Sequence, residues 1–142
     1  MRRARSYASC SGRWTLLTLP ERTADEIGLM LSGFFSHDRL DLGRVDAVVV
    51  GSVVPVLTPT LCRMAERYVG CHPLVVDPLA DVGMPILYER PAELGADRIA
   101  NSVAAYDRYG RAANAPLVVV GLGTATIFDA VTARGEYLGG VI

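Results

Sequence analysis

The feature that most constrains the fold is the apolar stretch at residues 116–142, PLVVVGLGTATIFDAVTARGEYLGGVI. Residues 117–120 are typical of a buried strand, and two further strands are expected after the turns at residues 121–126 and Arg134-Gly135. Glycine lets a backbone approach an anion closely, and threonine hydroxyls and free N–H groups can donate to its oxygens. The pattern predicts either a phosphate-holding loop or an ordinary β-hairpin whose turn needs glycine.

Length and charge narrow the class of protein. The chain has 142 residues, 51% of them hydrophobic, which is enough for one globular domain with its own core. Its net charge of −1 gives no electrostatic attraction to nucleic acid or to a membrane surface. No apolar run approaches the roughly 20 residues of a transmembrane helix. We therefore expect a soluble protein with neither nucleic acid nor membrane as a partner.

Cysteine and lysine usage exclude several chemistries. Cys10, Cys62 and Cys71 lack the CxxC spacing of a metal site, and no apolar signal segment precedes them, which favours a reduced, cytoplasmic setting. The chain has no lysine, so all 14 of its basic residues are arginine. Because a Walker-A loop and Schiff-base catalysis both need lysine, a bound phosphate would be held by backbone groups, hydroxyls, arginine or a cation.

Strand and helix patterns alternate along the rest of the chain. A capping box formed by Thr23 and Glu26 begins an amphipathic helix that runs to Phe35. The other predicted elements are a short strand at 14–19, a strand buried on both faces at 45–54, a helix from 58 with Thr58 as its N-cap and Gly70 after its end, and a strand at 73–76. This alternation predicts a three-layer α/β domain over residues 13–142, after a poorly ordered tail at residues 1–12.

A second candidate site is the start of the helix predicted after Gly95. Asp97 and Arg98 precede a stripe of small apolar residues that can pack closely on a sheet. An aspartate in a first helical turn often only complements the helix dipole, and spacing alone favours this structural role. The functional alternative has Asp97 accepting a proton from a substrate hydroxyl while Arg98 holds substrate or phosphate oxygens.

Four segments together resemble the type III pantothenate kinases, in the same order along the chain. They are residues 52–55 (SVVP), 95–101 (GADRIAN), 123–129 (GTATIFD) and 135–140 (GEYLGG). The resemblance runs from about Thr15 to Ile142, and the capping box at Thr23 is similar to the family's first helix. Several motifs in a fixed order are more specific than any one of them.

The resemblance implies an ATP-dependent kinase that phosphorylates pantothenate, the first step of coenzyme A biosynthesis. The implied fold is α/β, a ribonuclease-H-like lobe of the acetate and sugar kinase/Hsp70/actin fold. By matching position, Asp97 is expected to be the general base, and Gly123 and Thr124 are expected to contact ATP phosphate. The pantothenate site is expected to contain Tyr88, Gly95, Ala96, Asp97 and Arg98. Similarity to the family also implies a homodimer that uses Mg²⁺ and a monovalent cation, K⁺ or NH₄⁺.

Three regions depart from the family pattern. Residues 1–12 contain no equivalent of the Asp-x-Gly-Asn-Thr phosphate loop with which the family opens, and the family continues beyond Ile142 into a second lobe. The family's later phosphate turn begins with an aspartate that helps to hold the monovalent cation, whereas this chain has Gly121. Glycine has no carboxylate, so we assign no metal ligand and expect the turn to keep its shape with impaired chemistry.

Two other interpretations of the chain stay open. The departures are compatible with a non-catalytic regulatory or binding descendant, similar to family members named Bvg accessory factor, whose partner would be a protein. A gene fragment or a mistaken start is the other alternative. The leading expectation from sequence is the N-terminal portion of a type III pantothenate kinase that is weakly active or inactive.

Overall fold

The computed structural model describes residues 12–142, so all but the last residue of the expected tail lies outside the described part. The described chain is a mixed α/β structure. Its helices are α1 (Ala24–His37), α2 (Thr58–Met64), α3 (Ala96–Ala105) and α4 (Arg111–Ala113), and its strands are β1 (Val49–Val50), β2 (Leu74–Val75), β3 (Leu117–Leu122), β4 (Thr126–Val131) and β5 (Tyr137–Val141). Wider π turns extend α2 over Ala65–Val69 and α3 over Tyr106–Gly110, and 3₁₀ turns lie at Leu42–Arg44, Pro55–Leu57 and Pro91–Glu93.

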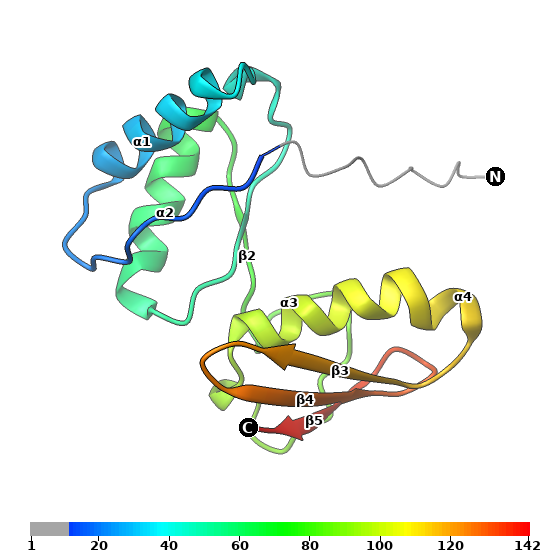
Figure 1. Cartoon of the computed structure of the whole chain (residues 1–142). Helices are drawn as coiled ribbons and strands as arrows, with labels where there is room; N and C mark the ends of the chain where they lie inside the picture. The colour runs from blue at the N-terminus through cyan, green and yellow to red at the C-terminus, as the bar shows by residue number, and fades with distance from the viewer. Residues whose placement is uncertain (1–11) are drawn as a thin grey trace.

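The strands form two separate sheets (Figure 1). β1 and β2 pair in parallel, whereas β3, β4 and β5 form an antiparallel sheet in that order. The prediction of a three-layer α/β domain is therefore confirmed only as a mixed α/β structure, because the strands do not form one continuous sheet. The short turns between β3, β4 and β5 pair each strand with its neighbour in sequence, while the two residues of β1 pair only with β2 among the described strands. The assignment of residues 13–142 to a single ribonuclease-H-like lobe stays a prediction.

Helix α1 confirms the predicted capping box. The Thr23 hydroxyl accepts from the Glu26 amide at 3.2 Å, and the Thr23 amide donates to Glu26 Oε2 at 2.7 Å. The strand predicted at residues 14–19 is wrong, because these residues make no strand pairing. The Trp14 ring instead stacks on Phe34 of α1, with 5.8 Å between the ring centroids.

The predictions around β1 and α2 are correct in type but wrong in detail. Only Val49 and Val50 form the strand, and Val49 is 63% exposed, so the strand is not buried on both faces. The N-cap of α2 is Leu57 rather than Thr58, because the preceding 3₁₀ turn leads directly into the helix and gives Thr58 a helical backbone. Gly70 follows the helical segment with a φ of 81°, as predicted for a glycine after a helix end.

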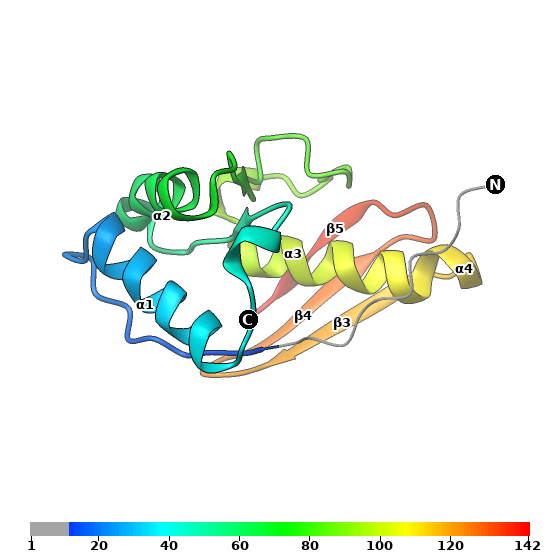
Figure 2. The same cartoon turned by 90° about the horizontal axis from the view of Figure 1, so that it is seen from above.

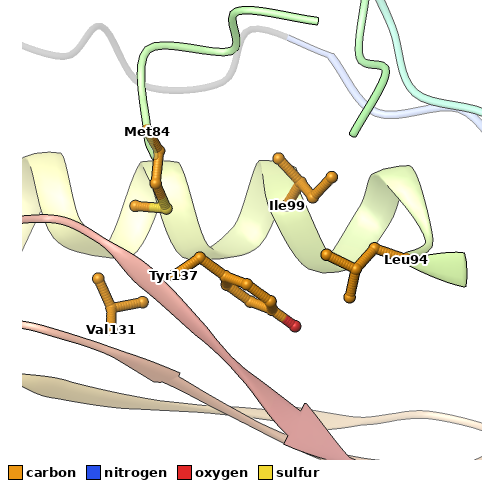
Figure 3. Packing of buried hydrophobic residues seen from close by; sticks show 5 residues of the cluster. All are labelled: Met84, Leu94, Ile99, Val131 and Tyr137. Atoms are coloured by element: carbon orange, nitrogen blue, oxygen red, sulfur yellow. The ribbon is translucent and has the colours of Figure 1, made fainter. Parts of the chain in front are cut away.

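The antiparallel sheet and α3 enclose the hydrophobic core (Figure 3). Figure 3 shows Met84, Leu94 and Ile99 facing Val131 and Tyr137 of the sheet. Ile99 and Tyr137 are fully buried at 0% exposure. The chain before α3 also joins the free edge of β5, because the Leu87 amide donates to the Tyr137 carbonyl at 2.8 Å and the Tyr137 amide donates to the Pro85 carbonyl at 2.8 Å. The core therefore fixes α3 and residues 85–87 against one sheet.

The opposite face of this sheet is apolar and exposed. Its exposed side chains are Val118, Val120, Leu122, Phe128 and Val141. The prediction that residues 117–120 are buried is correct only in part, because Leu117 and Val119 face α3 while the alternate side chains point away from it. No helix within residues 12–142 is long and apolar enough to cross a membrane.

Candidate active site

The first turn of α3 carries both charged residues of the predicted site. Gly95 is the N-cap residue, and the exposed Asp97 carboxylate lies over it, where a side chain at Gly95 would collide with Oδ1. A Cβ at Gly95 would also lie 3.5 Å from Val53 Cγ1, so this glycine brings Asp97 close to the 52–55 loop. Within residues 12–142, the Asp97 carboxylate has no hydrogen-bond or ion-pair partner, which leaves it available to a ligand.

Unlike the exposed Asp97, Arg98 forms a buried ion pair with Asp129 of β4. Its Nε and Nη2 atoms donate to the same oxygen, Asp129 Oδ1, at 3.0 and 2.6 Å. The Tyr137 hydroxyl donates to that oxygen at 2.6 Å. The side chains of Arg98 and Asp129 are only 11% and 4% exposed. The hydrogen bond that Arg98 donates to Asp129 is the largest cause that raises the pKa of Arg98, so the guanidinium stays charged.

Two glycines of β5 provide the space that this cluster occupies. A Cβ at Gly140 would lie 2.7 Å from Arg98 Nη2 and would collide with the Phe128 carbonyl oxygen. At Gly139, where φ is +120°, a Cβ would lie 2.8 Å from Tyr88 Cδ2. Side chains at either position would displace Arg98 or Tyr88, so the two glycines let these predicted site residues approach the sheet.

A cleft with a volume of about 620 Å³ lies beside the start of α3. Gly95 and Ala96 contribute to its wall, together with Ser52 and Val53 of the 52–55 loop. Tyr88, Asp97 and Arg98 are not among its lining residues. A cavity of this size can hold a small metabolite. Residues of two motifs, 52–55 and 95–101, thus line one cleft. Asp97 lies at the border of this cleft, since it is bonded to Ala96 and lies over Gly95.

The predicted phosphate residues Gly123 and Thr124 lie in the exposed turn between β3 and β4. The Gly123 amide donates to the Ala125 carbonyl at 3.1 Å, so the expectation of a free N–H group is wrong at this residue. The Thr124 hydroxyl has no partner within residues 12–142, and a Cβ at Gly123 would meet no atom within 4 Å. Figure 2 shows this turn at the same end of the sheet as the start of α3. The turn therefore fits the approach of a phosphate through Thr124.

The described residues contain no cluster of His, Cys, Asp or Glu side chains for a cation. Gly121 lies within β3 opposite Ile127 and offers no side-chain oxygen. Residues 12–142 contain no group of three or more His, Cys, Asp or Glu side chains arranged to hold a metal ion. Cys62 and Cys71 are free thiols.

Sequence reasoning missed Asp129, Tyr137 and Gly140 as site residues, although their motifs carried the family resemblance. A signal for Asp129 was present, because it alternates with Ile127 and Val131 and therefore belongs to the inward face of β4. A carboxylate on an apolar face needs a charged or hydrogen-bonding partner. That requirement predicts a partner for Asp129 but does not identify Arg98.

The buried tyrosine gives the fold a sensitivity to high pH. Burial first, and then the hydrogen bond to Asp129, raise the pKa of Tyr137 above its ordinary value of about 10. The folded state holds this proton more tightly than the unfolded state, so the stabilisation is complete below about pH 10 and is lost as the pH rises towards the folded pKa. Urea unfolding of wild type and Tyr137→Phe between about pH 8 and pH 11 measures the effect. We expect a steeper loss of stability in wild type, and parallel declines would contradict this.

Known proteins place the chain in a family. The family model described as Type III pantothenate kinase matches residues 4–142. The chain belongs to the type III pantothenate kinase family. It is 49% identical over 129 residues to the type III pantothenate kinase of Myxococcus xanthus (strain DK1622), an alignment that covers 91% of this chain and 49% of the relative. It is also 51% identical over 129 residues to that of Anaeromyxobacter sp. (strain K), with 91% and 49% of the two chains covered.

A more distant relative shows the same coverage. The type III pantothenate kinase of Koribacter versatilis (strain Ellin345) is 42% identical over 137 residues, which is 96% of this chain and 48% of the relative. The chain therefore spans about half the length of the curated type III pantothenate kinases that it matches.

Proposed function

We propose that this chain acts as a type III pantothenate kinase and transfers the γ-phosphoryl group of ATP to the primary hydroxyl of pantothenate, giving 4′-phosphopantothenate and ADP. Family membership supports the choice of reaction. The structural observation that carries it is Asp97, an exposed carboxylate without a partner in the described chain, at the helix start that borders the cleft. Within residues 12–142 this carboxylate makes no hydrogen bond or ion pair, so it is available to act as a base.

In the proposed reaction, Asp97 accepts the proton of the pantothenate hydroxyl while the hydroxyl oxygen attacks the γ-phosphorus. The bond from that phosphorus to the bridging oxygen breaks, and ADP leaves with the electron pair. Gly95 and Ala96 line the cleft proposed for pantothenate, and Tyr88 and Arg98 lie beside Gly139 and Gly140 of β5. Thr124 donates to a phosphate oxygen of ATP, for which its exposed hydroxyl is available.

Several further properties belong to the same proposal. They are the ribonuclease-H-like lobe, a homodimer, a requirement for Mg²⁺ and for K⁺ or NH₄⁺, and a cytoplasmic location. The free thiols of Cys62 and Cys71 are compatible with a reducing compartment. Within residues 12–142 no group of three or more His, Cys, Asp or Glu side chains is arranged to hold a metal ion, and Gly121 supplies no carboxylate. The ligands of a cation would therefore include backbone carbonyls, oxygens of ATP or groups outside the described residues.

An assay of the purified chain tests this function. The chain is incubated with pantothenate, ATP, Mg²⁺ and K⁺ or NH₄⁺, and phosphopantothenate is measured by mass spectrometry. We expect product above that formed by an Asp97→Asn control. Product at the level of the control would reject an active kinase.

A second candidate function is a non-catalytic regulatory protein that binds a protein partner. The observation that favours it is Gly121, which leaves the phosphate turn without a carboxylate for a cation. Titration calorimetry with ADP separates the two functions. Nucleotide binding with a dissociation constant in the micromolar range would count against the regulatory protein.

A further inference from the structure

The hydrogen-bond geometry of the Arg98–Asp129–Tyr137 cluster is more specific than stabilisation of the fold requires. A buried ion pair often contributes no more to stability than apolar side chains of similar volume would. Here a single carboxylate oxygen accepts three hydrogen bonds, two from Arg98 and one from Tyr137. Two donors from one guanidinium fix its direction more tightly than one donor would. The cluster therefore holds the orientation of Arg98.

One nitrogen of Arg98 stays available in this arrangement. Nε and Nη2 are engaged by Asp129, whereas Nη1 has no partner within residues 12–142. The Arg98 side chain keeps 11% of its surface exposed. The residue also follows Asp97 in the first turn of α3, so its backbone lies at the same end of the helix as the proposed base. A charged donor held in this way can recognise an oxyanion.

We propose that Asp129 is a positioning residue, which together with Tyr137 holds Arg98 so that Nη1 binds an oxyanion of the substrate. This inference rests on the proposed kinase function. Pantothenate carries a carboxylate and ATP carries phosphates, so the shared chemistry is a negatively charged oxygen. Gly140 leaves room for this arrangement, because a Cβ there would lie 2.5 Å from Asp129 Oδ1 and 2.7 Å from Arg98 Nη2.

The test compares the full chain with Asp129→Asn, Tyr137→Phe and Val131→Ala variants. Val131 is the matched control for a loss of core packing alone, because it lies two residues beyond Asp129 on the same buried face of β4, packs in the core cluster that contains Tyr137 and has no hydrogen-bonding side chain. Calorimetry measures the dissociation constants for pantothenate, ADP and panthenol, an analogue with a hydroxymethyl group in place of the carboxylate. The ¹⁵N–¹H signal of Arg98 Nε reports the ion pair without any ligand.

We expect Asp129→Asn to remove the slowly exchanging Arg98 Nε signal and to weaken pantothenate binding by about tenfold, because a charge-assisted contact is lost. Tyr137→Phe should give a smaller loss, since the ion pair remains, and this variant decides the question if Asp129→Asn does not fold. Panthenol affinity should be the same in wild type and the variants. If ADP rather than pantothenate loses affinity, the oxyanion is a phosphate and the positioning role still holds.

Two results would overturn the positioning role. One is an Asp129→Asn variant that keeps the Arg98 Nε signal and binds pantothenate and ADP as Val131→Ala does. The other is equal weakening of pantothenate, panthenol and ADP, which indicates a structural role only. Wild-type protein that binds neither pantothenate nor ADP would instead reject the proposed function, and the oxyanion with it.

Discussion

Replacement of Asp97 by asparagine should lower the turnover number for pantothenate phosphorylation by about 100-fold or more, because a general base typically contributes about 10²- to 10⁴-fold. The Michaelis constant for pantothenate should change by less than about threefold, since a base acts in the transition state rather than in substrate binding. Asparagine keeps the size of the side chain and removes only its capacity to accept a proton. Steady-state kinetics at saturating ATP measure both constants.

Asp107→Asn is the matched control for this variant. Asp107 is also an exposed aspartate, on the π turn that extends α3, and it pairs with Arg111 rather than lying at the helix start. We expect its turnover number to stay within about twofold of wild type, as is usual for a surface position away from the site. Equal activity of the two variants would contradict the role of Asp97 as the base.

The largest effect on stability should follow from removal of the Asp129 carboxylate. Asp129→Ala should lower the free energy of unfolding by about 3 to 5 kcal/mol, because it leaves the buried Arg98 charge without its partner. The Tyr137 hydroxyl loses its acceptor in the same variant. Chemical denaturation followed by circular dichroism measures the change, provided that the slope against denaturant is unchanged.

A double variant distinguishes the stability lost with the Arg98–Asp129 ion pair from the cost of burying Arg98 without a partner. Arg98→Met combined with Asp129→Leu removes both charges and fills the space with apolar groups, so it should be more stable than Asp129→Ala alone. A double variant that is less stable than the single one would show that the pair itself supplies a large net stabilisation. A loss below about 1 kcal/mol in Asp129→Ala would contradict burial of the pair.

Several patterns that depend on neighbours in sequence were predicted correctly, whereas the strand at residues 14–19 and the Thr58 N-cap were not. The Thr23 capping box, the helix after Gly95 and the three strands in residues 116–142 are all present in the structure. Each depends on contacts within one helical turn or across one short connection. The two-sheet arrangement was not predicted, because alternating strands and helices do not specify which strands pair. The exposure of Val118 and Val120 was missed for the same reason, since burial depends on what covers each face.

The candidate site was predictable only in part. The 95–101 motif located Asp97 and Arg98 at a helix start, which the structure confirms. Their different environments were not predictable, because the partner of Arg98 lies 31 residues away in sequence. Tyr88 reaches the cluster only because residues 85–87 pair with the edge of β5. Long-range pairing of this kind leaves no pattern in the local sequence.

The most direct test of the central claim is a backbone amide NMR titration of the ¹⁵N-labelled chain, first with pantothenate and then with ADP. We predict that pantothenate shifts the signals of residues 95–98 in the first turn of α3, two of which line the cleft, and of Tyr88, which lies beside Gly139. ADP should shift those of Gly123 and Thr124 in the β3–β4 turn. Pantothenate shifts confined to residues away from the start of α3, or no shifts at saturating pantothenate, would contradict the assignment of this helix start as the site of pantothenate phosphorylation.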